Sequence, residues 1–327
     1  MSDTSLVGLA RRHVIPSVLP MRPRLSTPEL IVLAFFVYII LAAFISHLAA
    51  RDLAIIITLN TLTIVTLRTL RRNRQRALWL AAAADLFPAL FVLVAYRESG
   101  LLLTPDPAHH LDYVFVQWDR VLLSNLFVQA MLQAGAPWLQ YYLELVYLLC
   151  YPLVPLGVVA VHFTSPRGAA SEPASTQGNR AMDRFWAAVL LATFFCYAAY
   201  PFFPLTPPRV LFGDVPGPHV APLLRKCNLW LLDHYSVQAC IFPSGHVAAV
   251  TAVALAVRKH APRLGAVFMF LAASVAVATV YGRYHYAVDA VAGALVGVAA
   301  YSASIVITHR SSRGASNSEN ASQEGTK

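Results

Sequence analysis

Long apolar runs separated by short polar connections dominate the pattern along this chain. A helix needs roughly 20 mostly apolar residues to cross the hydrocarbon core of a bilayer, and about eight runs approach or reach that length. They cover residues 28–48, 52–67, 77–95, 139–163, 184–203, 245–258, 264–281 and 285–307. The pattern predicts an all-α fold, a polytopic membrane bundle of about eight transmembrane helices.

Two connections, residues 96–138 and 204–244, are much longer than the others on their side of the membrane. Within the first, residues from Trp118 to Leu132 carry apolar positions at helical spacing, which predicts a helix lying in the membrane interface. A lid packed on the bundle is the alternative. Residues 165–178 and the tail after Ser311 are polar and lack apolar periodicity, so we expect both to be disordered.

Composition agrees with a bilayer environment, because 57% of the residues are hydrophobic, 13% are charged and the mean hydropathy is +0.58. The net charge of +9 could suggest a nucleic-acid partner. The basic residues, however, lie in short loops between spans rather than on one face, so we expect them to set membrane topology and expect no nucleic acid to bind.

The basic clusters predict which side each loop occupies. Arg68 to Arg76 crowd the connection after the second run, and Arg258, Lys259 and Arg263 fill the one after the sixth. Both loops should be cytoplasmic. Alternation of the spans then puts both termini in the cytoplasm and both long connections outside. We expect an integral protein of the plasma (inner) membrane whose leader is not a cleaved signal peptide.

The cysteines give no sign of a metal site. Cys150 and Cys196 fall inside spans, where a small buried apolar role is usual. Cys227 and Cys240 share the second long connection, and the sequence leaves open whether they form a disulfide.

The segment Phe242-Pro243-Ser244-Gly245-His246 stands where the second long connection enters the sixth run. Pro, Ser and Gly are residues that begin helices. Because a helix N-terminus offers unpaired backbone N–H groups and the positive end of a dipole, an anion can bind there. His246 would stand beside that anion, although a lone histidine at an interface is more often a hydrogen-bonded surface residue.

A second polar motif, from Gly282 to Asp289, begins the last run at the same side of the membrane. His285 and Asp289 are four residues apart, so on a helix the carboxylate can accept a proton from one imidazole nitrogen and leave the other nucleophilic. An ionisable residue within a span usually has a partner or a function. The pair predicts a catalytic histidine.

A third motif, Pro204 to Arg209, follows the fifth run, where the Arg209 guanidinium could hold phosphate oxygens. Two histidines, a carboxylate and arginines from distant segments fit phosphoryl transfer. There is no Gly-rich nucleotide loop and no carboxylate cluster suited to magnesium, so we expect no ATP, metal or cofactor. Four tyrosines of the fourth run, Tyr141, Tyr142, Tyr147 and Tyr151, are expected to anchor or pack rather than join the site.

Pro-Ser-Gly-His followed by His-x-x-x-Asp at successive outer helix ends resembles the type-2 phosphatidic acid phosphatase superfamily, which has a vanadium haloperoxidase-related fold. The resemblance covers roughly residues 77–307 and implies a six-helix core there. Residues 1–27 would be a cytoplasmic leader, 28–76 an additional helix pair and 308–327 a cytoplasmic tail. The layout is closest in pattern to the inositol phosphorylceramide synthase-like branch.

The resemblance also implies roles for residues. His285 would be the nucleophile that forms a phosphohistidine, Asp289 would orient it, and His246 would protonate the leaving alkoxide. Ser244, Gly245 and Arg209 would bind phosphate. The family's Lys and Pro of the first motif are Phe202 and Val210 here, and the usual Arg before the nucleophile is Thr279, so Arg283 is the candidate to replace that charge.

Three functions follow as hypotheses. The first is a membrane lipid phosphatase acting on a lipid phosphate or pyrophosphate at the extracytoplasmic face. The second is a lipid phosphotransferase that moves a phospho-head group to an alcohol acceptor. The third is a transporter or lipid-binding protein in which Asp85, Glu144 and Asp289 form a proton or ion path. The sequence does not specify the lipid, the acceptor or the oligomeric state.

Overall fold

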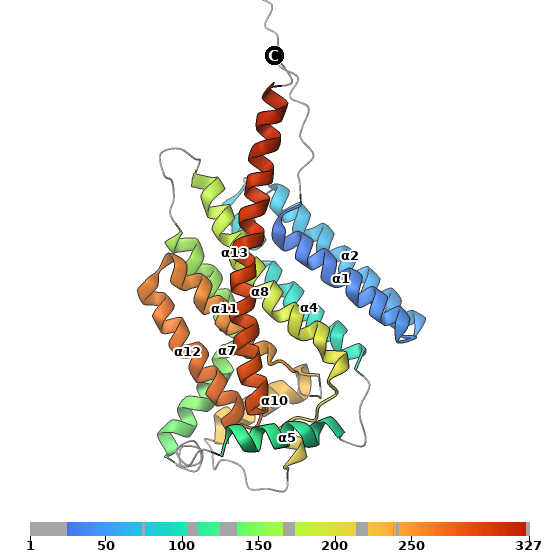
Figure 1. The fold of residues 1–327 in the computed structure, drawn as a ribbon, viewed down its shortest axis with the longest axis vertical. Helices are drawn as coiled ribbons and strands as arrows, with labels where there is room; N and C mark the ends of the chain where they lie inside the picture. The colour runs from blue at the N-terminus through green and yellow to red at the C-terminus, as the bar shows by residue number, and fades with distance from the viewer. Residues whose placement is uncertain are drawn as a thin grey trace, which may run out of the picture.

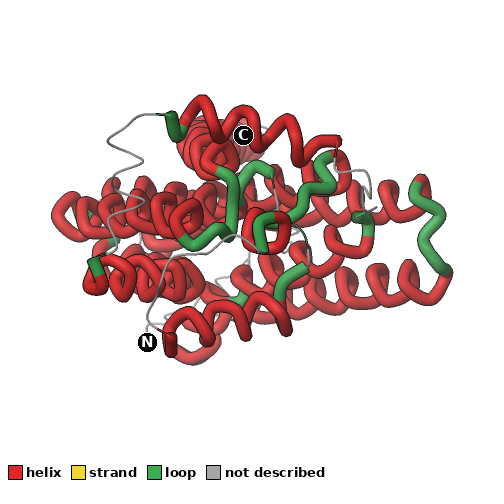
Figure 2. Tube along the Cα trace, turned by 90° about the horizontal axis from the view of Figure 1, so that it is seen from below, coloured by secondary structure: helices red, strands yellow, loops and turns green. Residues whose placement is uncertain are grey.

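The computed structural model describes residues 25–73, 76–103, 110–124, 136–165, 174–213, 222–237, 239 and 242–324. These residues form helices and loops without a strand (Figure 2), which confirms the predicted all-α bundle. Seven helical segments are long and apolar enough to cross a membrane: Thr27–Ile45, Ala50–Asn73, Leu78–Leu101, Pro137–Thr164, Arg180–Phe202, Pro262–Tyr281 and Ala287–His309. The chain is therefore an integral membrane protein.

The predicted sixth span is present as a shorter helix, α11 (Gly245–His260), which has 16 residues. It is the central helix of the bundle, packed against α7 (Pro137–Thr164), α8 (Ala174–Ala199), α12 (Pro262–Tyr281) and α13 (Ala287–Glu324). Most of its side chains are buried alanines and valines. These small residues allow four neighbours to approach closely, and because other helices surround α11 it needs little contact with lipid.

Two glycines set how closely α13 approaches α11. A Cβ on Gly293 would lie 2.5 Å from the Ser244 backbone oxygen, and one on Gly297 would lie 2.7 Å from the Ala248 oxygen. Any larger residue would therefore have to push the helices apart. This small-xxx-small spacing is typical of close helix pairs in membranes, and it brings the N-terminal ends of α11 and α13 together.

The first two helices, α1 (Thr27–Ile45) and α2 (Ala50–Asn73), lie side by side at one edge of the bundle (Figure 1). Ser26 and Glu29 form a reciprocal capping box at the start of α1. The helix α1 packs on α8, and α2 packs on α3 (Leu78–Leu86), which leads at Pro88 into α4 (Pro88–Leu101). The helices α1 and α2 thus pack on the outer side of α8 and α3.

The remaining helices gather at the end where α13 begins. They are α5 (His110–Leu122), the short turns η1 (Tyr200–Phe202) and α9 (Pro208–Leu211), and α10 (Pro222–Tyr235). In Figure 1, α5 lies across the lower end of α13. The predicted interfacial helix therefore starts earlier than Trp118 and ends at Leu122, while residues 125–135 lie outside the described part.

Three further expectations meet different findings. The helix α13 continues to Glu324, where the sequence predicts a disordered tail, and α8 begins at Ala174 inside the segment 165–178. Residues 166–173 lie outside the described part. Cys227 is exposed with a free thiol, and Cys240 lies outside the described residues.

Candidate active site

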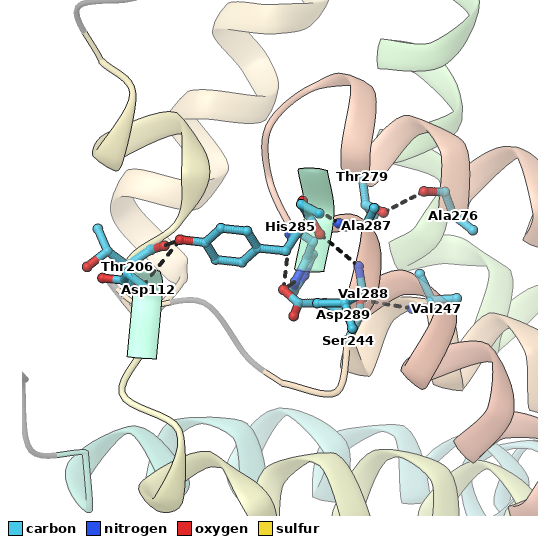
Figure 3. Close-up of polar contacts among 12 residues, drawn as sticks. Asp112, Thr206, Ser244, Val247, Ala276, Thr279, His285, Ala287, Val288 and Asp289 are labelled. Carbon is cyan, nitrogen blue, oxygen red and sulfur yellow. Dashed lines mark hydrogen bonds and ion pairs between the residues drawn. The ribbon is translucent and has the colours of Figure 1, made fainter. Parts of the chain in front are cut away.

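The Pro-Ser-Gly-His motif forms the start of α11, as the sequence predicts. Ser244 is the N-cap, and its Oγ accepts a hydrogen bond from the Val247 N–H at 3.5 Å (Figure 3). The Ser244 N–H donates to the Asp289 carbonyl at 3.1 Å, which links the first turns of α11 and α13. His246 follows Gly245 in this turn, where the first N–H groups of a helix have no acceptor within the helix.

His285 lies just before α13 rather than within it, so the expectation that the last helix includes residue 285 is wrong. The helix begins at Ala287, which makes Asp289 the third residue of its first turn. His285 Nδ1 lies 3.3 Å from Asp289 Oδ2, and the same oxygen accepts the Tyr286 N–H at 3.1 Å (Figure 3). The predicted pair therefore exists, formed by a turn that folds back on the helix start.

The turn that carries His285 is held by backbone bonds. The Thr279 carbonyl accepts the N–H groups of both Tyr284 and His285, at 2.9 and 3.1 Å. Thr279 stands where the family pattern has an arginine, and its Oγ1 donates to the Ala276 carbonyl of its own helix. This position therefore fixes the turn and supplies no charge.

The two histidines are neighbours, with ring centroids 5.9 Å apart and ring planes at 63°. His285 and Asp289 are both buried. His246 Nδ1 is also buried, and it has no hydrogen-bond partner in the described part of the chain. Two imidazoles of which one is oriented by a carboxylate can serve as a nucleophile and an acid.

Two tyrosines that the sequence analysis leaves out of the site contact His246. Tyr147 lies with its ring centroid 5.9 Å from the His246 ring, and Tyr151 meets the ring edge to face at 5.6 Å. Their spacing of four residues puts both on one face of α7. That spacing was visible in the sequence, but nothing local says which helix faces His246.

The two arginines of the predicted site occupy different positions. The Arg209 N–H donates to the Arg283 carbonyl at 2.8 Å, so the segment from Pro204 to Arg209 is joined through the backbone to the segment from Gly282 to Asp289. The Arg283 side chain instead reaches the Phe212 carbonyl, 3.4 Å away.

A buried polar network supports the His285 turn from the side of α7 and α10. Glu144 Oε1 lies 3.0 Å from Arg225 Nη1, and Glu144 Oε2 accepts hydrogen bonds from Asn228 and Tyr284. Arg225 also donates to the Gly282 carbonyl at 2.8 Å. Burial raises the pKa of the Tyr284 hydroxyl, which keeps it protonated as a donor. Glu144 thus has a structural role that the sequence did not reveal.

Asp112 of α5 holds the segment from Pro204 to Arg209. Its Oδ1 accepts the Thr206 N–H at 2.8 Å and lies 3.2 Å from the Tyr286 hydroxyl, which is 3.1 Å from the Thr206 carbonyl (Figure 3). A contact between residues this far apart in the sequence leaves no local signal.

Among the described residues, no group of three or more His, Cys, Asp and Glu side chains gathers as a metal site would.

Comparison with known proteins agrees with this geometry. A family model described as the PAP2 superfamily matches residues 115–303, which is more than half of the chain. The matched range begins in α5 and ends in α13. No curated protein and no solved structure matches the chain. The matched segment contains all seven residues of the predicted site. The chain therefore belongs to the PAP2 superfamily, which supports a membrane protein of the phosphatase or phosphotransferase type.

Proposed function

We propose that this protein is a membrane lipid phosphatase that hydrolyses a lipid phosphate or pyrophosphate through a phosphohistidine on His285. The observation that carries the proposal is the pairing of His285 with Asp289 beside His246, at the meeting point of two helix N-termini. Membership in the PAP2 superfamily supports the same class of reaction.

The first half of the reaction transfers the phosphoryl group to the enzyme. His285 keeps its proton on Nδ1, where it donates a hydrogen bond to Asp289, and in this tautomer the Nε2 lone pair is free to attack phosphorus. An N–P bond forms while the bond from phosphorus to the lipid oxygen breaks. His246 gives its proton to that oxygen. The leaving group is the lipid alcohol, or the lipid monophosphate when the substrate is a pyrophosphate, and it departs with this oxygen protonated.

The second half returns the enzyme to its starting state. His246, now without its proton, takes a proton from a water molecule, and the resulting hydroxide attacks phosphorus. The N–P bond breaks and inorganic phosphate leaves. Negative charge on the phosphoryl oxygens is stabilised by the Arg209 guanidinium, the Ser244 hydroxyl and the Gly245 N–H.

The membrane location argues for a lipid substrate. The helix ends that carry His246 and His285 lie at one end of a bundle whose outer faces expose large apolar side chains, among them Phe270 and Leu295. A lipid can keep its tails beside such faces while its phosphate reaches the helix ends. We place this end outside the plasma (inner) membrane, because the basic loops lie at the other end of the spans.

Phosphate release by purified protein in detergent tests the proposal. The panel includes phosphatidic acid and a polyprenyl pyrophosphate, each with and without a chelator. We expect His285→Ala and His246→Ala to lower the rate by about 10³-fold or more, as loss of a nucleophile or its acid does. His260→Ala is the matched control, since His260 lies at the opposite end of α11 from His246. Equal rates for wild type and His285→Ala would contradict the proposal.

A phosphotransferase is the second candidate, and one observation favours it. The charge that simple phosphatases carry six positions before the nucleophile is absent at Thr279, while Arg283 stands two positions before it, as in the synthase-like branch. In that case an alcohol replaces water as the acceptor and every named residue keeps its role. Transfer of a phospho-head group to added inositol or another alcohol, without phosphate release, would identify this activity.

An ion path is less well supported than either enzyme. Glu144 is ion-paired with Arg225, and Asp85 lies 3.4 Å from His162 Nδ1. Both carboxylates have partners that account for their burial. A transporter also has no use for a carboxylate-oriented histidine beside a second histidine.

A further inference from the structure

The helix that follows the proposed nucleophile has an unusual start. Tyr286 occupies the N-cap position of α13, where Ser, Thr, Asp or Asn usually accepts hydrogen bonds from the first turn. The Tyr286 hydroxyl points elsewhere, toward Asp112 and Thr206. The side chain that accepts hydrogen bonds from the first N–H groups of α13 therefore comes from another part of the chain.

Asp119 of α5 supplies this cap. Its Oδ2 accepts the Ala287 N–H at 2.9 Å and its Oδ1 accepts the Val288 N–H at 3.0 Å. The two carboxylate oxygens thus satisfy the first two donors of α13 across 168 and 169 residues of sequence. A negative charge is also favourable at this end of the helix dipole.

The position of Asp119 is fixed by the face of α5 on which it lies. Asp112, Phe115 and Asp119 are spaced i, i+3 and i+7, so they share one face. Phe115 is buried in a small apolar cluster with Leu205 and Tyr286. The opposite face exposes Tyr113 and Val121. The helix α5 is therefore docked through one face on the motifs that precede and begin α13.

Asp119 and Asp289 accept hydrogen bonds from different backbone N–H groups at the start of α13. Asp289 Oδ2 accepts the Tyr286 N–H and contacts His285, while Asp119 holds the next two N–H groups. If Asp119 were absent, those two donors would lack their acceptor, and Asp289 is the carboxylate in the same turn that could turn toward them. His285 would then lose the partner that orients it.

We propose that Asp119 is a positioning residue: by capping α13 from α5, it keeps the Asp289 carboxylate on His285. This role rests on the proposed function for its effect on catalysis, but the hydrogen bond that it preserves can be observed without turnover.

The charge of Asp119 makes this role depend on pH. Burial raises the pKa of the Asp119 carboxyl to about 6, with the negative charge of Asp289 adding to the increase and the two backbone N–H groups opposing it. The other ionisable groups at this junction are His285, which contacts Asp289, and Asp112 of α5, which contacts the Tyr286 hydroxyl, while Arg120 of α5 is exposed. Below about pH 6 the carboxyl gains a proton and loses an acceptor, so the cap weakens as the pH falls.

Steady-state kinetics of wild type, Asp119→Asn and Asp119→Glu between pH 5 and 8 tests the proposal. We expect Asp119→Asn to lower kcat by about 10- to 100-fold with little change in KM, because misplacement by about 1 Å can cost about 10² in rate. The ratio of wild-type to mutant kcat should be largest above about pH 6 and shrink below it, since protonated Asp119 resembles asparagine. Asp119→Glu keeps the charge and should retain more activity.

Asp233→Asn is the matched control, because Asp233 is an exposed carboxylate on α10 at the same end of the bundle. It should behave as wild type does. If Asp119→Asn matched wild type in kcat across this pH range, the positioning role would be excluded. Should Asp119→Asn fail to fold, Asp119→Ala replaces it: a kcat at least tenfold below that of Asp119→Glu above about pH 6 supports the role, and equal kcat in these two variants contradicts it.

Imidazole ¹⁵N spectra of His285 separate this proposal from the reaction itself. Asp119→Asn should shift the His285 Nδ1 signal toward that of Asp289→Asn, where the hydrogen bond to the carboxylate is removed. This result would support positioning even if wild type released no phosphate from any lipid, which would count against the proposed function alone. An Nδ1 signal unchanged by Asp119→Asn would overturn the positioning role whatever the activity.

Discussion

At the scale of single residues, Arg283 combines a strained backbone with a guanidinium that reaches a backbone carbonyl, that of Phe212. Its φ of 58° lies in the left-handed region, which residues other than glycine rarely adopt. The conformation costs a residue with a Cβ roughly 1 kcal/mol. Strain of this kind at a proposed site is a reason to test the side chain for function.

Replacing Arg283 with glycine separates the backbone from the side chain. We expect Arg283→Gly to leave the free energy of unfolding unchanged or raise it by about 1 kcal/mol, because glycine adopts this φ without strain. If the guanidinium binds phosphate, KM should rise or kcat fall by about tenfold or more. Thermal denaturation and phosphate release measure the two effects, and Arg283→Lys tests whether charge alone suffices. Full activity in Arg283→Gly would remove it from the site.

The residues that could be predicted from the sequence are those joined by local geometry. His285 and Asp289 are four positions apart, and Ser244 and His246 begin one helix, so spacing alone brings each pair together. Asp119, Tyr147 and Arg225 escaped prediction because their contacts cross from one helix to another. A carboxylate in an amphipathic helix, such as Asp119, looks like a solvated residue until its partner is known.

At the scale of elements, the site depends on the close approach of α11 and α13. Gly293 lies against the Ser244 carbonyl, one helical turn after Asp289, whose carbonyl accepts the Ser244 N–H. Even one methyl group there would contact a backbone oxygen that cannot move independently of its helix.

This packing predicts that adding one methyl group at Gly293 lowers both stability and activity. We expect Gly293→Ala to lower the free energy of unfolding by about 1–3 kcal/mol, as overpacking does, and to reduce phosphate release because the two histidines move apart. Gly213→Ala is the control, since a Cβ there meets its nearest atom at 3.4 Å. Denaturation in detergent and the release assay measure both. Equal stability and activity in the two variants would show that the helices tolerate separation.

Element boundaries were the weaker part of the sequence interpretation. Apolar periodicity marks where a helix can be buried but not where its first hydrogen bond forms. The predicted starts therefore differ from the observed ones: residue 285 against Ala287 for α13, and Trp118 against His110 for α5. The short helix α11 also satisfied the pattern of a span, although its 16 residues are buried mainly by its neighbours.

At the scale of the whole molecule, one end of the bundle is built around the proposed chemistry. Polar contacts there link α5, α7, α10, α11 and the turn before α13. The bundle class followed from the sequence because composition and run length decide it. The way these elements meet did not, since it depends on contacts between residues up to 174 positions apart.

The central claim is that His285 carries the phosphoryl group, and direct detection of that intermediate tests it most directly. Wild type and His285→Ala are mixed with a lipid phosphate labelled on its phosphorus, stopped in alkali where phosphohistidine survives, and digested for mass spectrometry. The account predicts phosphate on His285 in wild type and none in His285→Ala. Turnover of the lipid with no phosphorylated His285, or with phosphate on His246 instead, would contradict it.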